Sequence, residues 1–203
     1  MKLGVNIPYY PNSKEAEECA KWLFNKRLHP IYEKNKNIIP LMWMDFNGQG
    51  CGKTRNIINE ILFNNVDYII YIDSDDIIGE DYLEKVYEAC KEGYDIIETK
   101  FSIKGNIVPF KDKLPNHVTG IAYKVDLIKD MKFNENRNIG EDTEYNNYIN
   151  ENKEFTRKCI DTVYYYNFGY NKECLSYRFN SGVIGEFKEW NRVLNLFKIL
   201  NII

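Results

Sequence analysis

Short apolar runs alternate with segments of helical spacing along the first hundred residues. The apolar runs predict buried strands at residues 3–7, 38–44, 67–72 and 94–99. Between them, apolar side chains recur three and four positions apart, which predicts helices. Strands that alternate with helices are typical of crossover units in a mostly parallel sheet. We therefore expect an α/β fold whose central sheet is flanked by helices.

The predicted helices have recognisable start signals. Asn12 followed three residues later by Glu15 forms a capping-box pattern, and apolar positions 16, 19, 20 and 23 then share one face. A second helix follows a glycine-rich loop and is marked by apolar positions 57, 58, 61 and 62. A third helix is predicted from about residue 80 to residue 91.

The second half of the chain loses this regular alternation. The segments GNIVPF (105–110), TGIAYK (119–124) and CIDTVYYYNF (159–168) predict strands set among short helices and loops. Apolar positions from about residue 185 to 203 form one helical stripe, which predicts a C-terminal amphipathic helix. Because no repeat or linker marks a boundary, we expect residues 1–203 to form a single domain.

Composition narrows the class of protein. Hydrophobic residues make up 44% of the 203 positions and charged residues 28%, which is typical of a globular domain and not of a disordered chain. A formal charge of -3 gives no electrostatic reason to expect a nucleic-acid partner, which would require a basic face. The five cysteines lack metal-site spacing, which predicts idle thiols in a reducing cytosol. An early proline argues against a signal peptide, and no apolar run approaches ~20 residues, so we expect a cytoplasmic protein.

The loop NGQGCGKTRN, residues 47–56, resembles a phosphate-binding P-loop. That motif requires a glycine, four further residues and then Gly-Lys, because successive backbone N–H groups wrap the phosphate. Counting back from Gly52, Asn47 stands where the first glycine is needed, and Gly48 is one residue too close. The spacing therefore argues against a P-loop.

Three acids follow directly on the strand predicted at residues 67–72. Asp73, Asp75 and Asp76 carry like charges that repel one another, and a bound cation would remove the repulsion. Carboxylate oxygens suit Mg²⁺ or Mn²⁺, and open α/β sheets bind ligands beyond the carboxyl ends of their strands. The alternative is a solvated turn that caps the following helix.

Polar residues end the neighbouring predicted strands as well. Asn6, Pro8 and Tyr9 close the first strand, and Asp45 closes the second. Since the carboxyl ends of parallel strands meet at one edge, three strands would present polar groups to one crevice. This convergence favours a ligand site over a solvated turn.

In the order of its motifs, the chain resembles the family-two glycosyltransferases, which are nucleotide-sugar-dependent enzymes with the GT-A fold. The short acidic motif is weak alone, whereas the ordered set, over about residues 3–176, is specific. The motifs are VNIPYYPN (5–12), Asp45, KTRN (53–56), YIIYIDSDD (68–76), TGIAYK (119–124), GEDTEYNNYI (140–149), YYYNF (164–168) and CLS (174–176). The resemblance implies a GT-A-like, Rossmann-like sheet, with a nucleotide-sugar half at about residues 1–100 and a mixed acceptor half at about 101–180.

The resemblance also implies a donor site at the strand ends. It places Asp45 and the Pro8–Tyr9 turn near the nucleotide base, with Asp73 on the ribose side. Lys53 and the glycines would then form a donor-side loop and not a phosphate cradle. The implied donor-binding residues are Pro8, Tyr9, Asp45, Arg55, Asn56, Asp73, Ser74 and Asp75.

A divalent metal is implied at the acidic motif. Asp75 would hold a Mn²⁺ or Mg²⁺ ion that bridges the two phosphates, and Asp73 and Asp76 are further candidate ligands, Asp76 being alternatively a helix cap. Some relatives add a late histidine as a ligand, which this sequence lacks. We expect His29 at the surface, and His117, before TGIAYK, is left without a role.

The GED segment supplies the implied catalytic group. Asp142 would be the general base, because a sugar hydroxyl attacks only as its proton is removed, an effect typically worth ~10²–10⁴-fold in rate. Glu141 would help to orient the acceptor. A base on one face of the sugar and the leaving group on the other give inversion. Alternatively, these acids simply lie favourably at a helix N-terminus.

Two aromatic features each have two interpretations. Tyrosines 164–166 could stack on a sugar, although half-buried packing is more typical of such a run. The C-terminal helix either packs on the domain or attaches peripherally to the inner face of a membrane that carries a lipid-linked acceptor.

The sequence as a whole predicts a metal-dependent, inverting, hexosyltransferase-type enzyme. It would move a sugar from a nucleotide-sugar donor, expected to be a UDP-sugar, to a hydroxyl of a glycan or lipid-linked saccharide. The alternative is a catalytically silent nucleotide-sugar or glycan-binding module with the same fold. An enzyme that makes nucleotide sugars is disfavoured, because VNIPYYPN is not the glycine-rich, basic signature expected there.

Overall fold

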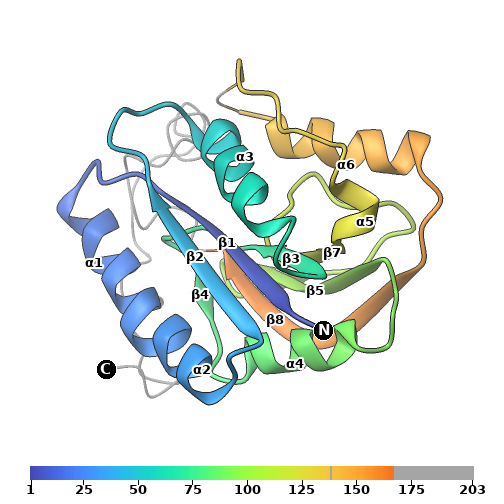
Figure 1. Cartoon of the computed structure of the whole chain (residues 1–203), viewed down its shortest axis with the longest axis horizontal. Coiled ribbons are helices and arrows are strands. Elements are labelled where there is room, and N and C mark those ends of the chain that lie inside the picture. Colours follow the sequence, from blue (N-terminus) through green and yellow to red (C-terminus); the bar gives the residue numbers. More distant parts are fainter. Residues whose placement is uncertain (138, 167–203) are drawn as a thin grey trace.

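A mixed sheet forms the middle layer of the structure, a computed structural model that describes residues 1–137 and 139–166 (Figure 1). Within these residues the sheet has eight strands in the order β2-β1-β3-β7-β5-β8-β4, and β6 pairs with β5. The strands are β1 (Leu3–Tyr9), β2 (Ile38–Met44), β3 (Tyr68–Tyr71), β4 (Ile77–Ile78), β5 (Ile96–Ile103), β6 (Asn106–Val108), β7 (Ile121–Lys124) and β8 (Arg157–Tyr166). The helices are α1 (Lys14–Leu23), the π-helical η1 (Phe24–Leu28), α2 (His29–Lys34), α3 (Cys51–Leu62), α4 (Tyr82–Cys90), α5 (Val125–Ile128) and α6 (Glu141–Asn152).

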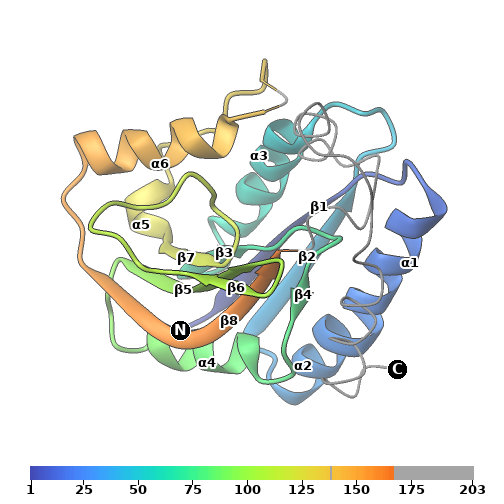
Figure 2. The same ribbon diagram turned by 180° about the vertical axis from the view of Figure 1, so that it is seen from behind.

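Helices cover both faces of the sheet, as the front and back views show (Figures 1 and 2). Helices α1, α2 and α4 pack on one face, where Leu3, Val5 and Ile7 of β1 lie in the buried core. Helices α3, α5 and α6 pack on the other, where Ile69 and Tyr71 of β3 are buried. Because alternate residues of a strand point to opposite faces, fully buried strands supply both cores.

Gly4 of β1 allows a close approach of α3. A Cβ atom on Gly4 would lie 3.0 Å from a methyl carbon of Leu62, so the Leu62 side chain would have to shift by a few tenths of an ångström. Asn6, which is fully buried, then fastens α3 to the strand. Its Nδ2 donates to the carbonyl oxygen of Arg55 at 3.0 Å and to Oδ1 of Asn59 at 2.8 Å.

The α/β class with a Rossmann-like sheet is confirmed, and the regular alternation in the first half follows the sequence pattern. The parallel pairs are β1–β2, β1–β3 and β5–β8, while β3–β7, β5–β7, β5–β6 and β4–β8 are antiparallel. The sheet is therefore more mixed than expected. The antiparallel pairs involve β4, β6, β7 and β8, and so come largely from the second half of the chain.

Several predicted boundaries differ from the observed ones; β5, for example, runs over Ile96–Ile103 and not over residues 94–99. Two of the differences have a clear local cause. Strand β1 continues through Pro8 to Tyr9, because β3 pairs with β1 only as far as Asn6, and beyond it the missing N–H of proline costs no bond to that neighbour. Helix α1 is capped by Ser13 and not by Asn12. Ser13 has an extended backbone, and its side chain accepts a hydrogen bond from the N–H of Ala16 at 3.1 Å.

Other expectations concern the ends and the surface of the chain. The predicted C-terminal amphipathic helix lies outside the described residues, so its packing and membrane roles stay predictions. None of the helices in the described part of the chain has the length and apolar content to cross a lipid bilayer. His29, at the start of α2, is exposed as predicted.

Candidate active site

A cavity of about 640 Å³ opens at the carboxyl ends of β1, β2 and β3, where the convergence of polar residues was predicted. Its walls come from these strand ends, from the first turns of α3 and α6, and from the segment before β7. The predicted site residues that line it are Pro8, Tyr9, Asp45, Arg55, Asp73, Ser74, Asp75, Glu141 and Asp142. The two halves of the chain therefore meet at one hollow.

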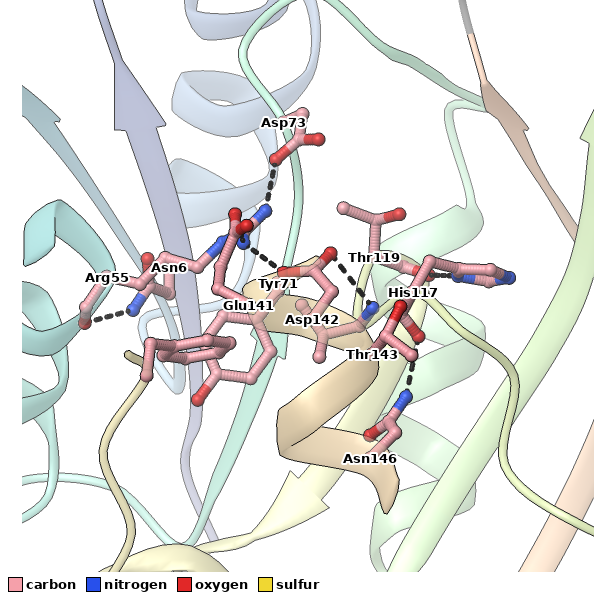
Figure 3. A network of polar contacts seen from close by, with 12 residues as sticks. Asn6, Arg55, Tyr71, Asp73, His117, Thr119, Glu141, Asp142, Thr143 and Asn146 are labelled. Carbon is pink, nitrogen blue, oxygen red and sulfur yellow. Dashed lines mark hydrogen bonds and ion pairs between the residues drawn. The ribbon is translucent and has the colours of Figure 1, made fainter. Parts of the chain in front are cut away.

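Arg55 is the hub of this site (Figure 3). Its side chain is only 2% exposed and contacts three carboxylates. Nη2 lies 2.9 Å from Asp73, and Nη1 lies 3.4 Å from Glu141 and in closer contact with Asp142. One guanidinium thus joins the acidic motif after β3 to the first turn of α6. Its planar fork of donors allows this shared geometry.

The surroundings of Arg55 bring the pKa of Asp142 close to neutral pH. Burial raises the pKa of Asp142 to about 6, with Glu141 and Asp73 adding to the rise, while Arg55 and the N–H of Val118 oppose it. For Arg55, burial acts to lower the pKa, but the surrounding acids, Asp142 foremost, raise it well above its usual range. The side chain of Asp142 is 19% exposed, so its carboxylate remains reachable from the cavity.

The acidic turn after β3 is pinned by Tyr164 of β8. The hydroxyl of this buried tyrosine accepts from the N–H of Asp73 at 3.0 Å and donates to Oδ2 of Asp76 at 2.5 Å. Burial and the two aspartates raise the pKa of Tyr164 far above 10, so the hydroxyl keeps its proton. The packing interpretation therefore holds for Tyr164, and the residue has a positioning role that sequence reasoning missed.

Asp75 carries a charge that its surroundings disfavour. Burial, followed by the charge of Asp73, raises the pKa of Asp75 to about 7. Two carboxylates that line one cavity and oppose each other's charge fit a divalent cation, since Mg²⁺ usually takes one or two protein carboxylates and completes its shell with water and phosphate oxygens. Within the described residues, no group of three or more His, Cys, Asp or Glu side chains is arranged to hold a metal. Any protein ligand set built here is accordingly small.

Replacing Asp75 by asparagine should stabilise the metal-free protein. The folded pKa is raised above the ordinary 3.8, so the charged form costs stability in full above about pH 7 and not at all near pH 4. We expect Asp75→Asn to raise the free energy of unfolding by about 0.5–2 kcal/mol at pH 8. The gain should shrink as the pH falls from 7 toward 4. Urea unfolding in EDTA at several pH values measures it.

The matched control is Asp81→Asn, because the Asp81 side chain is 60% exposed and its ion pair within residues 1–137 and 139–166 is with Lys85. Its change in unfolding free energy should stay within about 0.5 kcal/mol. If Asp75→Asn and wild type unfold alike at pH 8, the penalty assigned to the buried charge is absent.

The glycine loop is closed by Asp45 and not arranged around a phosphate. The carboxylate of Asp45 accepts from the N–H of Asn47 at 3.2 Å and from the N–H of Gly50 at 3.0 Å. Gly48 and Gly50 have positive φ angles of 63° and 99°, which side chains disfavour. These contacts turn the chain into α3 and present Arg55 one turn later, in agreement with the argument against a P-loop.

Two predicted site residues lie away from the cavity wall. Asn56 is 4% exposed and faces the other side of α3, where its amide bonds the backbone of Phe133 and the carboxylate of Glu135. As the next residue after Arg55 it is rotated about 100° around the helix, so both cannot point into the same hollow. Asp76 is 3% exposed and is held by Tyr164 behind the acidic turn.

Helix α6 fastens the segment before β7 to the side of the cavity that Asp142 lines (Figure 3). Asn146, which is fully buried, donates to the carbonyl oxygens of Pro115 at 2.8 Å and His117 at 2.7 Å. Oδ2 of Asp142 accepts from the N–H of Val118 at 3.3 Å. The segment carries His117 into the cavity wall, where the sequence had given it no role. Asn146 stands one helical turn after Asp142, and that spacing was the available signal.

The fold belongs to one class, the GT-A-like fold. S. aureus TarS, a GT-A-type glycosyltransferase, is structurally similar. Its residues 1–349 in complex with UDP-GlcNAc match with a TM-score of 0.60 and 21% identity, over 82% of this chain and 58% of that one. The same fragment in complex with UDP gives a TM-score of 0.58, 21% identity, and coverage of 82% and 60%. A197 from STIV gives a TM-score of 0.51 and 15% identity, over 79% and 82%.

This chain therefore spans about 60% of the TarS fragment. No protein-family model matches the sequence, and no curated protein sequence matches it. At 21% identity, the similarity establishes the fold alone.

Proposed function

We propose that this protein is a metal-dependent, inverting glycosyltransferase of the family-two type. It transfers a sugar from a nucleotide-sugar donor, a UDP-sugar, to a hydroxyl of a glycan or lipid-linked saccharide. The observation that carries the proposal is that Asp73 and Asp142 contact the same guanidinium, that of Arg55, in one cavity of a GT-A-like fold. The acidic turn proposed to bind the diphosphate and the proposed base are thus both in contact with one side chain, Arg55.

The donor lies along the strand ends in this proposal. Pro8, Tyr9 and Asp45 form the side of the cavity that takes the nucleotide base, and Asp73 with Ser74 takes the ribose side. The choice of UDP is supported by the complexes of TarS with UDP and UDP-GlcNAc. Asn56 supports this side only indirectly, by anchoring α3.

Asp75, with Asp73, would hold a Mn²⁺ or Mg²⁺ ion against the diphosphate. When bound, such an ion stabilises the negative charge of the leaving nucleoside diphosphate. Tyr164 fixes the backbone of the turn from behind, so the two carboxylates are positioned before the donor arrives. Asp76 contributes through this hydrogen bond to the shape of the turn.

Asp142 is the proposed general base. It accepts the proton of the acceptor hydroxyl as that oxygen attacks the anomeric carbon from the face opposite the diphosphate, which inverts the configuration there. A base whose pKa is about 6 is deprotonated at neutral pH and still able to hold a proton. Arg55 keeps the carboxylate oriented, and Glu141, which is 7% exposed at the cavity wall, orients the acceptor beside it.

The alternative is a nucleotide-sugar or glycan-binding module without turnover. The ion pair of Arg55 with Asp142 favours it, because a carboxylate engaged by a guanidinium is a weaker base. Two features oppose it: the raised pKa of Asp142 and its exposure to the cavity.

Release of the nucleotide from a donor panel separates these possibilities. UDP-glucose, UDP-galactose and UDP-GlcNAc, with GDP-mannose for comparison, are incubated with the protein and Mn²⁺ or EDTA. We expect Mn²⁺-dependent hydrolysis of at least one UDP-sugar, in which water takes the place of the acceptor hydroxyl, measured as release of UDP. If calorimetry shows saturable donor binding but no UDP is released, the protein is a binding module and not an enzyme. If the donors neither bind nor release UDP, the proposed function is contradicted.

A further inference from the structure

Residues 114–118, which lead to β7, have their backbone held by side chains of α6. They belong to no helix or strand, so their N–H and C=O groups need other partners. Polar residues of α6 are these partners, and they follow the segment in reverse order. Asp142 bonds the N–H of Val118, Thr143 the carbonyl oxygen of Asn116, Asn146 those of Pro115 and His117, and Asn150 both groups of Leu114. The segment and α6 therefore run antiparallel and are joined through side chains.

Asn146 is the central residue of this connection (Figure 3). It is fully buried, and its Nδ2 donates to the carbonyl oxygens of Pro115 and His117. Its Oδ1 accepts from the hydroxyl of Tyr123, which is buried on β7, at 2.7 Å. Because a carbonyl oxygen only accepts, the amide nitrogen must face the segment and the amide oxygen must face Tyr123. The whole amide group is thus used to hold the segment, and Asn146 does not line the cavity.

The segment in turn sets the surroundings of Asp142. Val118 directly follows His117, and its N–H donates to Oδ2 of Asp142 at 3.3 Å, while Arg55 contacts Oδ1. Both oxygens of the carboxylate are therefore held, one by a cation and one by a backbone N–H. A little further along, the N–H of Gly120 donates to the carbonyl oxygen of Tyr71 at 3.0 Å, two residues before the acidic turn begins. The same stretch of backbone thus connects Asp142 to that turn.

We infer that Asn146 is a positioning residue of the proposed reaction: it fixes segment 114–118, so that the N–H of Val118 stays on Asp142 and the carboxylate keeps the orientation in which it acts as base. Asn146 is neutral and lies outside the cavity wall, so it acts through Val118 and not on a substrate. The role of Asp142 in this inference rests on the proposed function. The contact itself can be measured without any turnover.

The charges around Asp142 give the direction of the expected effect. The ionisable groups that face it are Arg55 and Cys51 of α3, Tyr71 of β3, Asp73 of the acidic turn, Tyr123 of β7 and Glu141 of its own helix. Burial and the acids raise the pKa of Asp142, whereas Arg55 and the N–H of Val118 lower it. Replacing Asn146 by alanine alters none of these charges. It releases the N–H donor of Val118, which favoured the charged carboxylate, so the pKa of Asp142 should rise.

Two measurements test the inference. In metal-free protein labelled with ¹³C-aspartate, NMR follows the carboxyl carbon of Asp142, assigned by its loss in Asp142→Asn. Asn146→Ala should titrate about 0.5–1 pH unit above wild type. The rate of Mn²⁺-dependent UDP release at pH 6, relative to that at pH 8, should accordingly fall about 2–5-fold. UDP affinity at pH 8 should not change, because Asn146 does not line the cavity.

Asn147→Ala is the matched control, because Asn147 is the exposed neighbour of Asn146 on α6. It should keep the wild-type titration and rate ratio. Tyr123→Phe retains the ring and removes the hydroxyl that orients the amide of Asn146, so it should move Asp142 in the same direction by a smaller amount. If circular dichroism shows that Asn146→Ala does not fold, Tyr123→Phe decides by the same measurements.

The inference is overturned if the folded variant titrates at Asp142 as wild type does. It is also overturned if the titration moves while the pH dependence of UDP release stays where it was. Wild-type protein that releases no UDP from any donor contradicts the proposed function, and the NMR titration then still decides whether Asn146 holds Val118 on Asp142.

Discussion

Replacing Arg55 by methionine should lower the free energy of unfolding by about 3–5 kcal/mol at pH 8, the usual cost of removing one partner from a buried ion pair. The variant leaves Asp73, Glu141 and Asp142 facing one another without the cation that contacts all three. Methionine has a similar length, so the packing against Phe133, whose ring centre is 5.3 Å from the guanidinium carbon, is largely kept. The loss is therefore electrostatic in origin.

The pH dependence distinguishes this cause from a packing defect. Without Arg55, the folded pKa of Asp142 moves further above its unfolded value, so the penalty is complete above that pKa and is relieved as the pH falls through it. Urea unfolding followed by circular dichroism should show a smaller loss at pH 5.5 than at pH 8. A loss independent of pH would contradict the electrostatic account.

Arg137→Met is the matched control for Arg55→Met. Arg137 also pairs with an acid of α6, Glu144, but the two side chains are 50% and 44% exposed. Exposed pairs contribute about 0–1 kcal/mol, so this variant should unfold close to wild type. Arg55→Lys, which keeps the charge and loses the fork, should fall between the two. If Arg55→Met and Arg137→Met unfold with equal free energies, the ion pairs of Arg55 do not stabilise the fold more than an exposed pair does.

Replacing Asp142 by asparagine should slow UDP release from the active UDP-sugar by ~10²–10⁴-fold, the range for loss of a general base. The amide keeps the shape of the carboxylate, so the fold and the affinity for UDP should persist. Its NH₂ group cannot accept from Arg55 or from Val118, and a modest loss of stability is expected. Initial rates and calorimetric UDP binding measure the two effects separately.

The pH profile of the wild type gives a second check on Asp142. A general base acts in its deprotonated form, so the rate should hold above about pH 6 and fall as the pH drops through that value. Glu144→Gln, which neutralises an exposed acid two positions along α6, should leave the rate and the profile unchanged. A rate for Asp142→Asn within about threefold of wild type would mean that another group takes the proton.

The strands of the first half were predictable because each is a short apolar run bounded by polar residues or turn signals. Strand β2 was predicted with its observed bounds, and the α/β alternation followed from apolar periodicity alone. Antiparallel pairing in the second half was not predictable in the same way. Strand β7 pairs with both β3 and β5, and such long-range choices leave no periodic trace in a single sequence.

Most of the candidate site could be listed from the sequence, because strand ends are where an α/β sheet presents polar groups. Asp45, Asp73 and Asp75 were found by this rule and line the cavity. Asn56 was included with Arg55 because the two are adjacent in a motif. On a helix, adjacent residues point in different directions, and only the packed structure shows which of them faces the cavity.

The sequence by itself determined the class of fold, the acids at the strand ends and the acidic start of α6. Only the tertiary structure decided that Arg55 contacts both Asp73 and Asp142, the latter 87 positions further along the chain, and that His117 belongs to the cavity wall. The physical reason lies in the range of the forces. Backbone preferences and apolar periodicity act over a few neighbouring residues, whereas the charge balance of a buried site depends on groups that meet only after the sheet has closed.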